Sequence, residues 1–253
     1  MTLDALKLNG KNALVTGSQQ GLGAGIAIGL AQAGANVAIH GLSTPAEGVM
    51  AEVRKAGAKV ISVIGDVSDA KVCEAMVEQT VRELGSIDIL VNNAGIIRRA
   101  PAVEFSAKDW YDVLEVNLSS VFRFCQLAGG HMLKQGRGKI INIASLLAFQ
   151  GGVFVPSYAA AKGGVAQLTK ALANEWAADG INVNAIAPGY MATDNTAALR
   201  ADEQRSRQIL DRIPAGRWGT PQDLAGTAVF LASPASDYVN GHVLVVDGGW
   251  LAR

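Results

Sequence analysis

The chain has 253 residues, of which 22 are lysine or arginine and 22 are aspartate or glutamate, so its formal net charge at pH 7 is zero. A balanced charge gives no electrostatic attraction for DNA, RNA or an anionic membrane surface, so we expect neither nucleic acid nor membrane as a partner. Apolar residues make up 49% of the chain and charged residues 17%, a composition that can bury a large core and excludes a disordered protein.

Cysteines and histidines give no sign of a disulfide scaffold or a metal site. Cys73 and Cys125 match no zinc pattern, and the three histidines lack metal-ligand spacing, so no metal is expected. The first seven residues contain no apolar signal segment, and no window reaches the ~18 apolar residues of a membrane span. The sequence predicts a soluble cytoplasmic protein with buried, reduced cysteines.

Short β-branched runs alternate with longer helical patterns, and no linker divides the chain. The predicted strands are residues 12–16, 36–39, 60–65, 89–92, 139–143, 181–186 and 242–246. The predicted helices are residues 23–33, 69–84, 108–135, 157–178 and 221–231. This alternation predicts one domain over residues 1–253, an α/β fold of the Rossmann type with a doubly wound, seven-stranded parallel sheet. A polar helical segment at 196–212 is interpreted either as a mobile flap or as an ordinary static surface helix.

A (β/α)8 barrel has a similar length and alternation, and the first strand-to-helix turn argues against it. That turn reads TGSQQGLG over residues 16–23. Gly17 permits a sharp turn, Gly21 lets backbone approach a pyrophosphate, and Gly23 allows close helix–strand packing. The helix that follows offers unpaired N–H groups to phosphates. The turn therefore predicts a dinucleotide site.

The end of the second predicted strand bears on which dinucleotide is bound. It reads VAIHGL over residues 37–42 and contains neither a carboxylate for a ribose 2′-hydroxyl nor an arginine or lysine for a 2′-phosphate. A phosphate without a cationic partner is costly to bury, so the sequence favours NAD over NADP. His40 is interpreted as an ordinary residue at the strand end.

Tyr158 and Lys162 are four residues apart and share one helix face. A phenol has a pKa of ~10, and a nearby ammonium favours the phenolate and lowers that value. Three small alanines between the two residues leave room for a ligand. Ser145 follows the predicted strand at 139–143, at the edge where a parallel sheet binds its ligand. These residues predict a proton-transfer group.

Taken in chain order, these motifs resemble the short-chain dehydrogenase/reductase family, and the resemblance covers essentially the whole chain. Further matches are NNAG at residues 92–95, Asn117, PG at 188–189, and a spacing of 13 residues between Ser145 and Tyr158. The resemblance implies that Tyr158 is the general acid/base and that Lys162 lowers its pKa and holds the nicotinamide ribose. It implies that Ser145 contacts the substrate oxygen and that Asn117 supports a water chain.

The resemblance also implies a cofactor-binding set. Its members are Gly17, Gln19, Gln20, Gly21, Leu22, Gly23, Asp66, Val67, Asn93, Ala94, Gly95, Tyr158, Lys162, Pro188, Gly189 and Thr193. The chain departs from the family at the second strand end, where Gly41 stands at the usual aspartate position of NAD enzymes. Leu42 stands where NADP-dependent relatives tend to have arginine.

Segments that flank the expected site resemble family members that act on six-carbon sugar acids of the 2-dehydro-3-deoxy-D-gluconate or 2-deoxy-D-gluconate type. The resemblance implies interconversion of a secondary alcohol and a ketone on such an acid. A sugar carboxylate needs a cationic anchor, ideally a guanidinium. The substrate candidates are Arg98, Arg99, Arg217, Gln150 and Tyr190.

Rival functions remain open from the sequence. Within the family these are a 3-oxoacyl reductase or a gluconate 5-dehydrogenase, and outside enzymes a catalytically silent NAD-binding regulator. The family commonly forms homotetramers, and the apolar C-terminal strand with Trp250 is a candidate interface.

Overall fold

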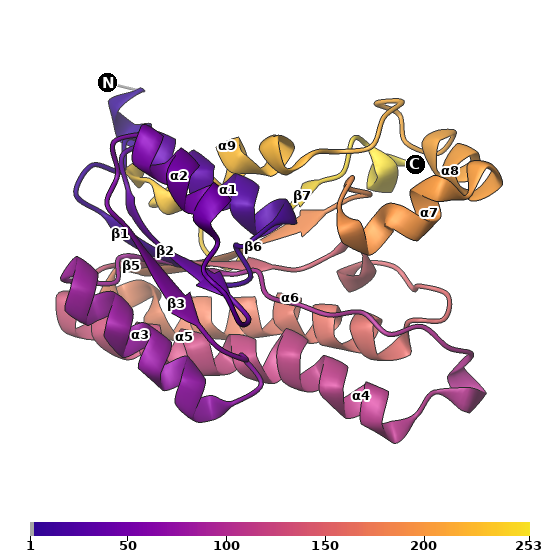
Figure 1. The fold of residues 1–253 in the computed structure, drawn as a ribbon, viewed down its shortest axis with the longest axis horizontal. Helices are drawn as coiled ribbons and strands as arrows, with labels where there is room; N and C mark the ends of the chain where they lie inside the picture. The colour runs from indigo at the N-terminus through magenta and orange to yellow at the C-terminus, as the bar shows by residue number, and fades with distance from the viewer. Residues whose placement is uncertain (1–2) are drawn as a thin grey trace.

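Seven parallel strands form the central sheet of the protein, which a computed structural model describes over residues 3–253 (Figure 1). The strand order is β3-β2-β1-β4-β5-β6-β7, which confirms the predicted doubly wound parallel sheet. The strands are β1 (Asn12–Val15), β2 (Asn36–Gly41), β3 (Val60–Ile64), β4 (Ile89–Asn92), β5 (Gly138–Ile143), β6 (Ile181–Pro188) and β7 (Val243–Val246). The chain reverses its direction of winding between β1 and β4, where ligands bind in such sheets.

The strands are apolar almost throughout because helices cover both faces of the sheet. Leu14 and Leu90 point into the core on one face, and Val15 and Val91, next along the same strands, point into the core on the other. Side chains alternate between faces along a strand, so a strand buried on both sides needs apolar residues at every position. The continuous apolar sequence of these strands therefore accounts for their position between the two layers of helices.

Two layers of helices lie on opposite sides of the sheet (Figure 1). The helices of one layer are α3 (Ala70–Leu84), α4 (Ala107–Leu114), α5 (Ser120–Gln135) and α6 (Pro156–Trp176). Those of the other are α1 (Gly21–Gln32), α2 (Glu47–Lys55) and α9 (Pro221–Ala232). Two short helices, α7 (Ala197–Ala201) and α8 (Glu203–Leu210), lie at one end of the molecule, close to the C-terminus.

Two elements differ from the sequence prediction. Helix α2 was not predicted, because it buries only Met50 and Val53 and therefore carries a weak apolar pattern. The long helix expected at 108–135 is interrupted by a π-helical turn at Glu115–Ser119. Such turns occur as single turns inside α-helices and are frequent at functional sites. The turn buries Asn117.

The C-terminal segment packs inside its own chain. Trp250 is 5% exposed and lies in a small core with Leu146, Ile209 and Ile213, so its ring is not available for the subunit interface that the sequence suggested. Arg253 donates hydrogen bonds to the carbonyls of Asp211 (2.6 Å) and Arg212, just after α8. The C-terminal residues Trp250 and Arg253 therefore pack against the α7–α8 segment and hold its end in place.

Within residues 3–253, no helix is both long enough and apolar enough to cross a membrane. Cys73 and Cys125 are free and buried, as predicted. Burial raises the pKa of the Cys73 thiol to about 11 and that of Cys125 to about 12, so both remain thiols at neutral pH.

Candidate active site

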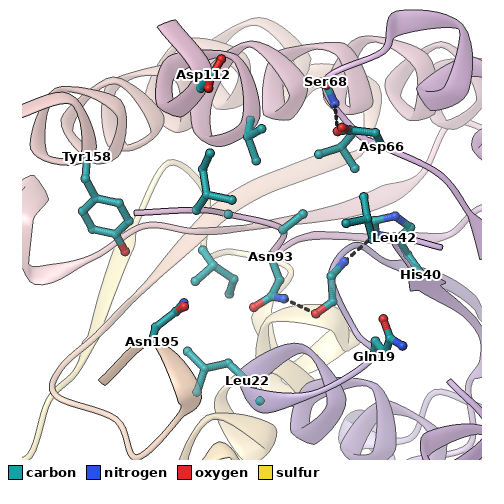
Figure 2. Close-up of a pocket in the computed structure, with 18 of the residues that line it drawn as sticks. Gln19, Leu22, His40, Leu42, Asp66, Ser68, Asn93, Asp112, Tyr158 and Asn195 are labelled. Atoms are coloured by element: carbon teal, nitrogen blue, oxygen red, sulfur yellow. Dashed lines mark hydrogen bonds between the residues drawn. The ribbon is translucent and has the colours of Figure 1, made fainter. Parts of the chain in front are cut away.

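A cleft of about 970 Å³ opens at the carboxyl ends of the central strands. Tyr158 lies at one end with its hydroxyl directed into the cleft, and His40, Asp66 and Ser68 lie at the other (Figure 2). Thirteen of the predicted cofactor residues line it: Gly17, Gln19, Gln20, Gly21, Leu22, Asp66, Val67, Asn93, Ala94, Gly95, Tyr158, Lys162 and Thr193. Gly23, Pro188 and Gly189 lie outside its wall.

The glycine turn is fixed to the start of the loop after β4. The side-chain amide of Asn93 donates to the carbonyls of Thr16 and Gly17, both at 2.9 Å. In return, the Thr16 hydroxyl accepts from the backbone N–H groups of Asn93 and Ala94. Gly17 has a φ of +61°, and a Cβ there would lie 2.8 Å from the Cα of Ala94. Only glycine fits this close approach.

Helix α1 begins at Gly21 beside this turn, and Gln20, its N-cap residue, makes no side-chain hydrogen bond to the first-turn N–H groups. Unpaired N–H groups and the positive end of the helix dipole favour an anionic ligand here. A Cβ on Gly23 would lie 2.4 Å from the carbonyl oxygen of Gly17, so this glycine allows the helix to pack against the turn, whereas the sequence predicted packing against a strand. Together with a cleft of this size, the turn fits a dinucleotide cofactor.

The His40 end of the cleft is neutral or acidic. The cations that line the cleft are Arg98, Lys108 and Lys162, and none belongs to the segments at 40–44 or 66–68. The carboxylate of Asp66 accepts a hydrogen bond from the backbone N–H of Ser68 at 2.9 Å. Among the described residues that line the His40 end of the cleft, no arginine or lysine is placed to bind a 2′-phosphate.

Tyr158 and Lys162 lie one turn apart near the start of α6, as their spacing predicted. The Lys162 ammonium lies 5.6 Å from the centre of the Tyr158 ring and donates a hydrogen bond to the carbonyl of Ile143 at 2.6 Å. Burial lowers the pKa of Lys162 to about 8. The two side chains therefore share the same end of the cleft, next to the carboxyl end of β5.

The predicted depression of the tyrosine pKa is not present in the free chain. Burial raises the pKa of Tyr158, while a hydrogen bond with Ser145 and the charge of Arg99 act in the opposite direction. Lys162 is not among these causes, because its ammonium is turned toward Ile143 and is itself desolvated. Further stabilisation of the phenolate must come from what enters the cleft.

Ser145 and Asn117 do not line the cleft, yet both touch the elements that form it. Ser145 lies directly after β5 and its hydroxyl also accepts from the backbone N–H of Leu147 at 3.2 Å. Both polar atoms of the Asn117 side chain bond to the backbone of Ile96, each at 2.8 Å. Asn117 thereby holds the loop after β4, and the π-helical turn is what brings it there.

Some of the predicted substrate residues already have side-chain partners within the part of the protein that the structure describes, and others do not. Arg98 lines the cleft and pairs with Asp109 at 3.4 Å. Arg217 forms a two-pronged ion pair with Asp223, both contacts 2.7 Å, at the start of α9. Gln150 accepts from the indole of Trp250, and the Tyr190 ring packs on Trp250 with centroids 4.6 Å apart. Within residues 3–253, Arg99 is exposed and has no ion-pair partner.

Sequence reasoning missed the contribution of His40 and did not single out Arg99 among its three candidate arginines. His40 is buried against the glycine turn rather than being an ordinary strand-end residue. Arg99 was considered only alongside Arg98 and Arg217, and its proximity to Tyr158 depends on how the loop after β4 folds. No local sequence pattern signals the role of either position.

Comparisons with known proteins agree with this geometry. A protein-family model described as enoyl-(acyl carrier protein) reductase matches residues 17–251. The chain is 58% identical to the 2-dehydro-3-deoxy-D-gluconate 5-dehydrogenase of Dickeya dadantii, over 100% of both chains. A solved structure from Agrobacterium tumefaciens with bound NADP, described as a 2-deoxy-D-gluconate 3-dehydrogenase, matches with a TM-score of 0.93 and 53% identity over 98% of this chain and 99% of that one. A gluconate 5-dehydrogenase from Burkholderia cenocepacia, in complex with NADP and tartrate, matches with a TM-score of 0.95 and 42% identity over 100% of both chains.

Proposed function

The chain belongs to the short-chain dehydrogenase/reductase family of pyridine-nucleotide oxidoreductases, and from this premise we propose that it interconverts a secondary alcohol and a ketone on a six-carbon sugar acid. The proposed substrates are of the 2-dehydro-3-deoxy-D-gluconate or 2-deoxy-D-gluconate type. The observation that carries the proposal is that Tyr158 and Lys162 line one end of a dinucleotide-sized cleft, with Ser145 next to Tyr158. Full-length likeness to sugar-acid dehydrogenases supports the substrate class.

The proton-transfer step falls to Tyr158. In the oxidative direction its phenolate oxygen takes the proton of the substrate hydroxyl, and in the reductive direction its hydroxyl returns a proton to the carbonyl oxygen. When bound, the nicotinamide cofactor supplies the hydride acceptor or donor. Ser145, whose hydroxyl acts to lower the pKa of Tyr158, donates to the same substrate oxygen as charge develops there.

Lys162 and Asn117 have supporting roles in this proposal. Lys162 keeps its ammonium at the buried end of the cleft, where it offers donors to ribose hydroxyls. Asn117 holds the loop after β4 through Ile96 and so keeps the wall of the cleft in place. A water chain that starts at Lys162 would carry the proton onward to solvent.

Arg99 is the proposed anchor for the substrate carboxylate. Of the three candidate arginines, Arg98 is paired with Asp109 and Arg217 is held by Asp223, whereas Arg99 is exposed and its charge acts on Tyr158. A guanidinium at this place can hold a carboxylate while leaving the sugar hydroxyls near the phenol. It also makes the binding of uncharged alcohols weaker than the binding of sugar acids.

The choice between NAD and NADP rests on the His40 end of the cleft. The sequence favours NAD because no cation lies there, whereas two related structures hold NADP. This chain also lacks the carboxylate at the end of β2 that would repel a 2′-phosphate. We therefore propose that both dinucleotides bind, with kcat/KM values within about tenfold of each other, because neither a charge repulsion nor an ion pair separates them.

A gluconate 5-dehydrogenase is the second candidate, favoured by the fit to the Burkholderia structure that holds tartrate, a small hydroxy acid. Absorbance of the reduced nicotinamide, measured with NAD and NADP against a panel of aldonic and keto-deoxy acids, tests both candidates. We expect the highest kcat/KM on a 2-deoxy or 3-deoxy sugar acid. Turnover confined to gluconate would select the second candidate, and turnover confined to 3-oxoacyl thioesters would overturn both.

A homotetramer remains part of the proposal, although Trp250 is buried in its own subunit. Exposed apolar side chains on α4 and α5, including Tyr111 and Phe122, offer a surface for another copy. Light scattering coupled to size-exclusion chromatography distinguishes a tetramer from a monomer.

A further inference from the structure

His40 joins two separate walls of the cofactor cleft. It lies near the end of β2, is 4% exposed, and its ring Nδ1 accepts a hydrogen bond from the backbone N–H of Gly17 at 2.8 Å. Its Nε2 lies 2.9 Å from the carbonyl oxygen of Gly65. A backbone N–H can only donate and a carbonyl can only accept, so the partners assign the neutral ring with its proton on Nε2.

The backbone of His40 is tied to the same turn. Its N–H donates to the Ser18 hydroxyl at 2.9 Å, and the N–H of Ser18 donates to the carbonyl of His40 at 3.1 Å. The Ser18 hydroxyl donates in turn to the carbonyl of Val15. The position of the imidazole is therefore set by β1 and β2 together, and the ring transmits that position to Gly17 on one side and Gly65 on the other.

The two bonded glycines belong to parts of the cleft that bind different portions of a dinucleotide. Gly17 begins the turn that faces the phosphates, and Gly65 directly precedes Asp66 and Val67 in the wall at the adenosine end. We propose that the neutral imidazole of His40 is a positioning residue that fixes the phosphate turn against the adenosine wall, and that it does not act as a cation for a 2′-phosphate. The proposal needs only a dinucleotide cofactor and is independent of the sugar-acid substrate.

The electrostatic setting of His40 agrees with a neutral ring. Burial lowers its pKa, and the hydrogen bond with Gly65 and the carboxylate of Asp66 only partly oppose that effect. Asp66 is the charged group that acts on the ring. The cations of the cleft, Arg98, Lys108 and Lys162, belong to the loop after β4 and to α4 and α6, not to the strands that hold His40.

Protonation of His40 would change the cofactor site in a defined way. A proton on Nδ1 would face the N–H of Gly17, so two donors would point at each other and the turn would have to move. The cleft would then be less well formed for NAD and for NADP alike. A histidine that clamped a 2′-phosphate would do the opposite, since its charged form would strengthen the binding of NADP alone.

The experiment measures dissociation constants by isothermal titration calorimetry, without substrate, for NAD and NADP from about pH 5 to about pH 8. The wild-type protein is compared with His40→Asn, which keeps an acceptor near Nδ1, and His40→Gln, which keeps a donor near Nε2. His242→Asn is the matched control, because His242 is exposed and precedes β7 at the opposite edge of the sheet. Circular dichroism melting of each protein reports on folding.

We expect the wild-type Kd for both dinucleotides to rise as the pH falls below the ordinary histidine value of 6.5. The His40 variants should show a Kd about 2- to 10-fold higher at neutral pH, the loss of one hydrogen bond, with no acid dependence below 6.5. The His242→Asn control should bind both dinucleotides as the wild type does.

Two results would overturn the proposal. One is a wild-type Kd that does not change with acid, and the other is NADP binding that tightens in acid while NAD binding does not. The wild-type profile needs no variant, so it decides the question even where a substitution prevents folding. Because the assay contains no sugar acid, its result is separate from the success or failure of the proposed dehydrogenase activity.

Discussion

Lys162 donates a hydrogen bond to the carbonyl of Ile143 at 2.6 Å, and so connects the helix that carries Tyr158 to the last residue of β5. The bond holds a buried ammonium beside the cleft without a carboxylate partner. Burial lowers its pKa to about 8, so the ammonium remains the main form at neutral pH. A cation kept in this place is costly for the fold and useful for stabilising a nearby phenolate.

Removal of the Tyr158 hydroxyl should abolish turnover but not cofactor binding. In Tyr158→Phe we expect kcat to fall about 10²- to 10⁴-fold, the usual contribution of a general acid/base. The phenyl ring keeps its place on α6, so the Kd for the dinucleotide and the melting temperature should stay close to wild type. Steady-state kinetics and calorimetry check this. Unchanged turnover would show that Tyr158 is not the general acid/base.

The buried Lys162 predicts a particular dependence of stability on pH. Its pKa is about 8 in the folded chain against 10.5 for an unburied lysine, so the unfolded chain binds more protons between these values. Where the unfolded state binds more protons, stability rises with pH. The penalty of about 3 kcal/mol for the buried charge is therefore complete below pH 8 and disappears above pH 10.5.

Lys162→Met removes this titration. We expect the free energy of unfolding of the wild type, relative to Lys162→Met, to increase between pH 7 and about pH 10. Urea denaturation of both proteins at several pH values measures the difference. A constant difference across that range would mean that Lys162 titrates normally and is not desolvated. Lys170→Met on the same helix, at an exposed site, is the matched control.

Substitution of Arg99 should affect acidic substrates selectively. In Arg99→Ala we expect KM for sugar acids to rise about 10- to 100-fold, the loss of one charge-assisted hydrogen bond. Arg217→Ala should change KM little, because its guanidinium is held by Asp223. Kinetics on an acid and on its uncharged lactone or alcohol provide the comparison. Equal KM values in Arg99→Ala and wild type would refute the anchor.

The predicted flap at 196–212 forms two short helices, α7 and α8, and its mobility is still a prediction. Arg200 donates to the carbonyl of Thr193, which lines the cleft, while Ile209 is 1% exposed in the core with Trp250. Amide hydrogen exchange should therefore slow in α7 when a dinucleotide is added and change less near Ile209. Equal exchange in α7 with and without cofactor would show that it is a static surface helix.

Much of the molecule follows from local sequence. The first three residues of β4 are apolar and buried, and Gly17 stands where only a missing Cβ fits, so composition and local pattern are sufficient to place both. The i, i+4 spacing of Tyr158 and Lys162 places both on one face of α6 in any helix. These features depend on residues close to each other in the chain.

What only the tertiary structure decided depends on groups that are distant in sequence. The raised pKa of Tyr158 comes from desolvation, which exists only once the cleft is assembled. His40 gains its two partners from Gly17 and Gly65, which lie 23 and 25 residues away along the chain. The π-helical turn at Glu115–Ser119 carries Asn117, which bonds to Ile96, 21 residues away along the chain. Desolvation and hydrogen bonds between distant residues produce no repeating pattern of residue types along the chain, so they cannot be predicted from such a pattern.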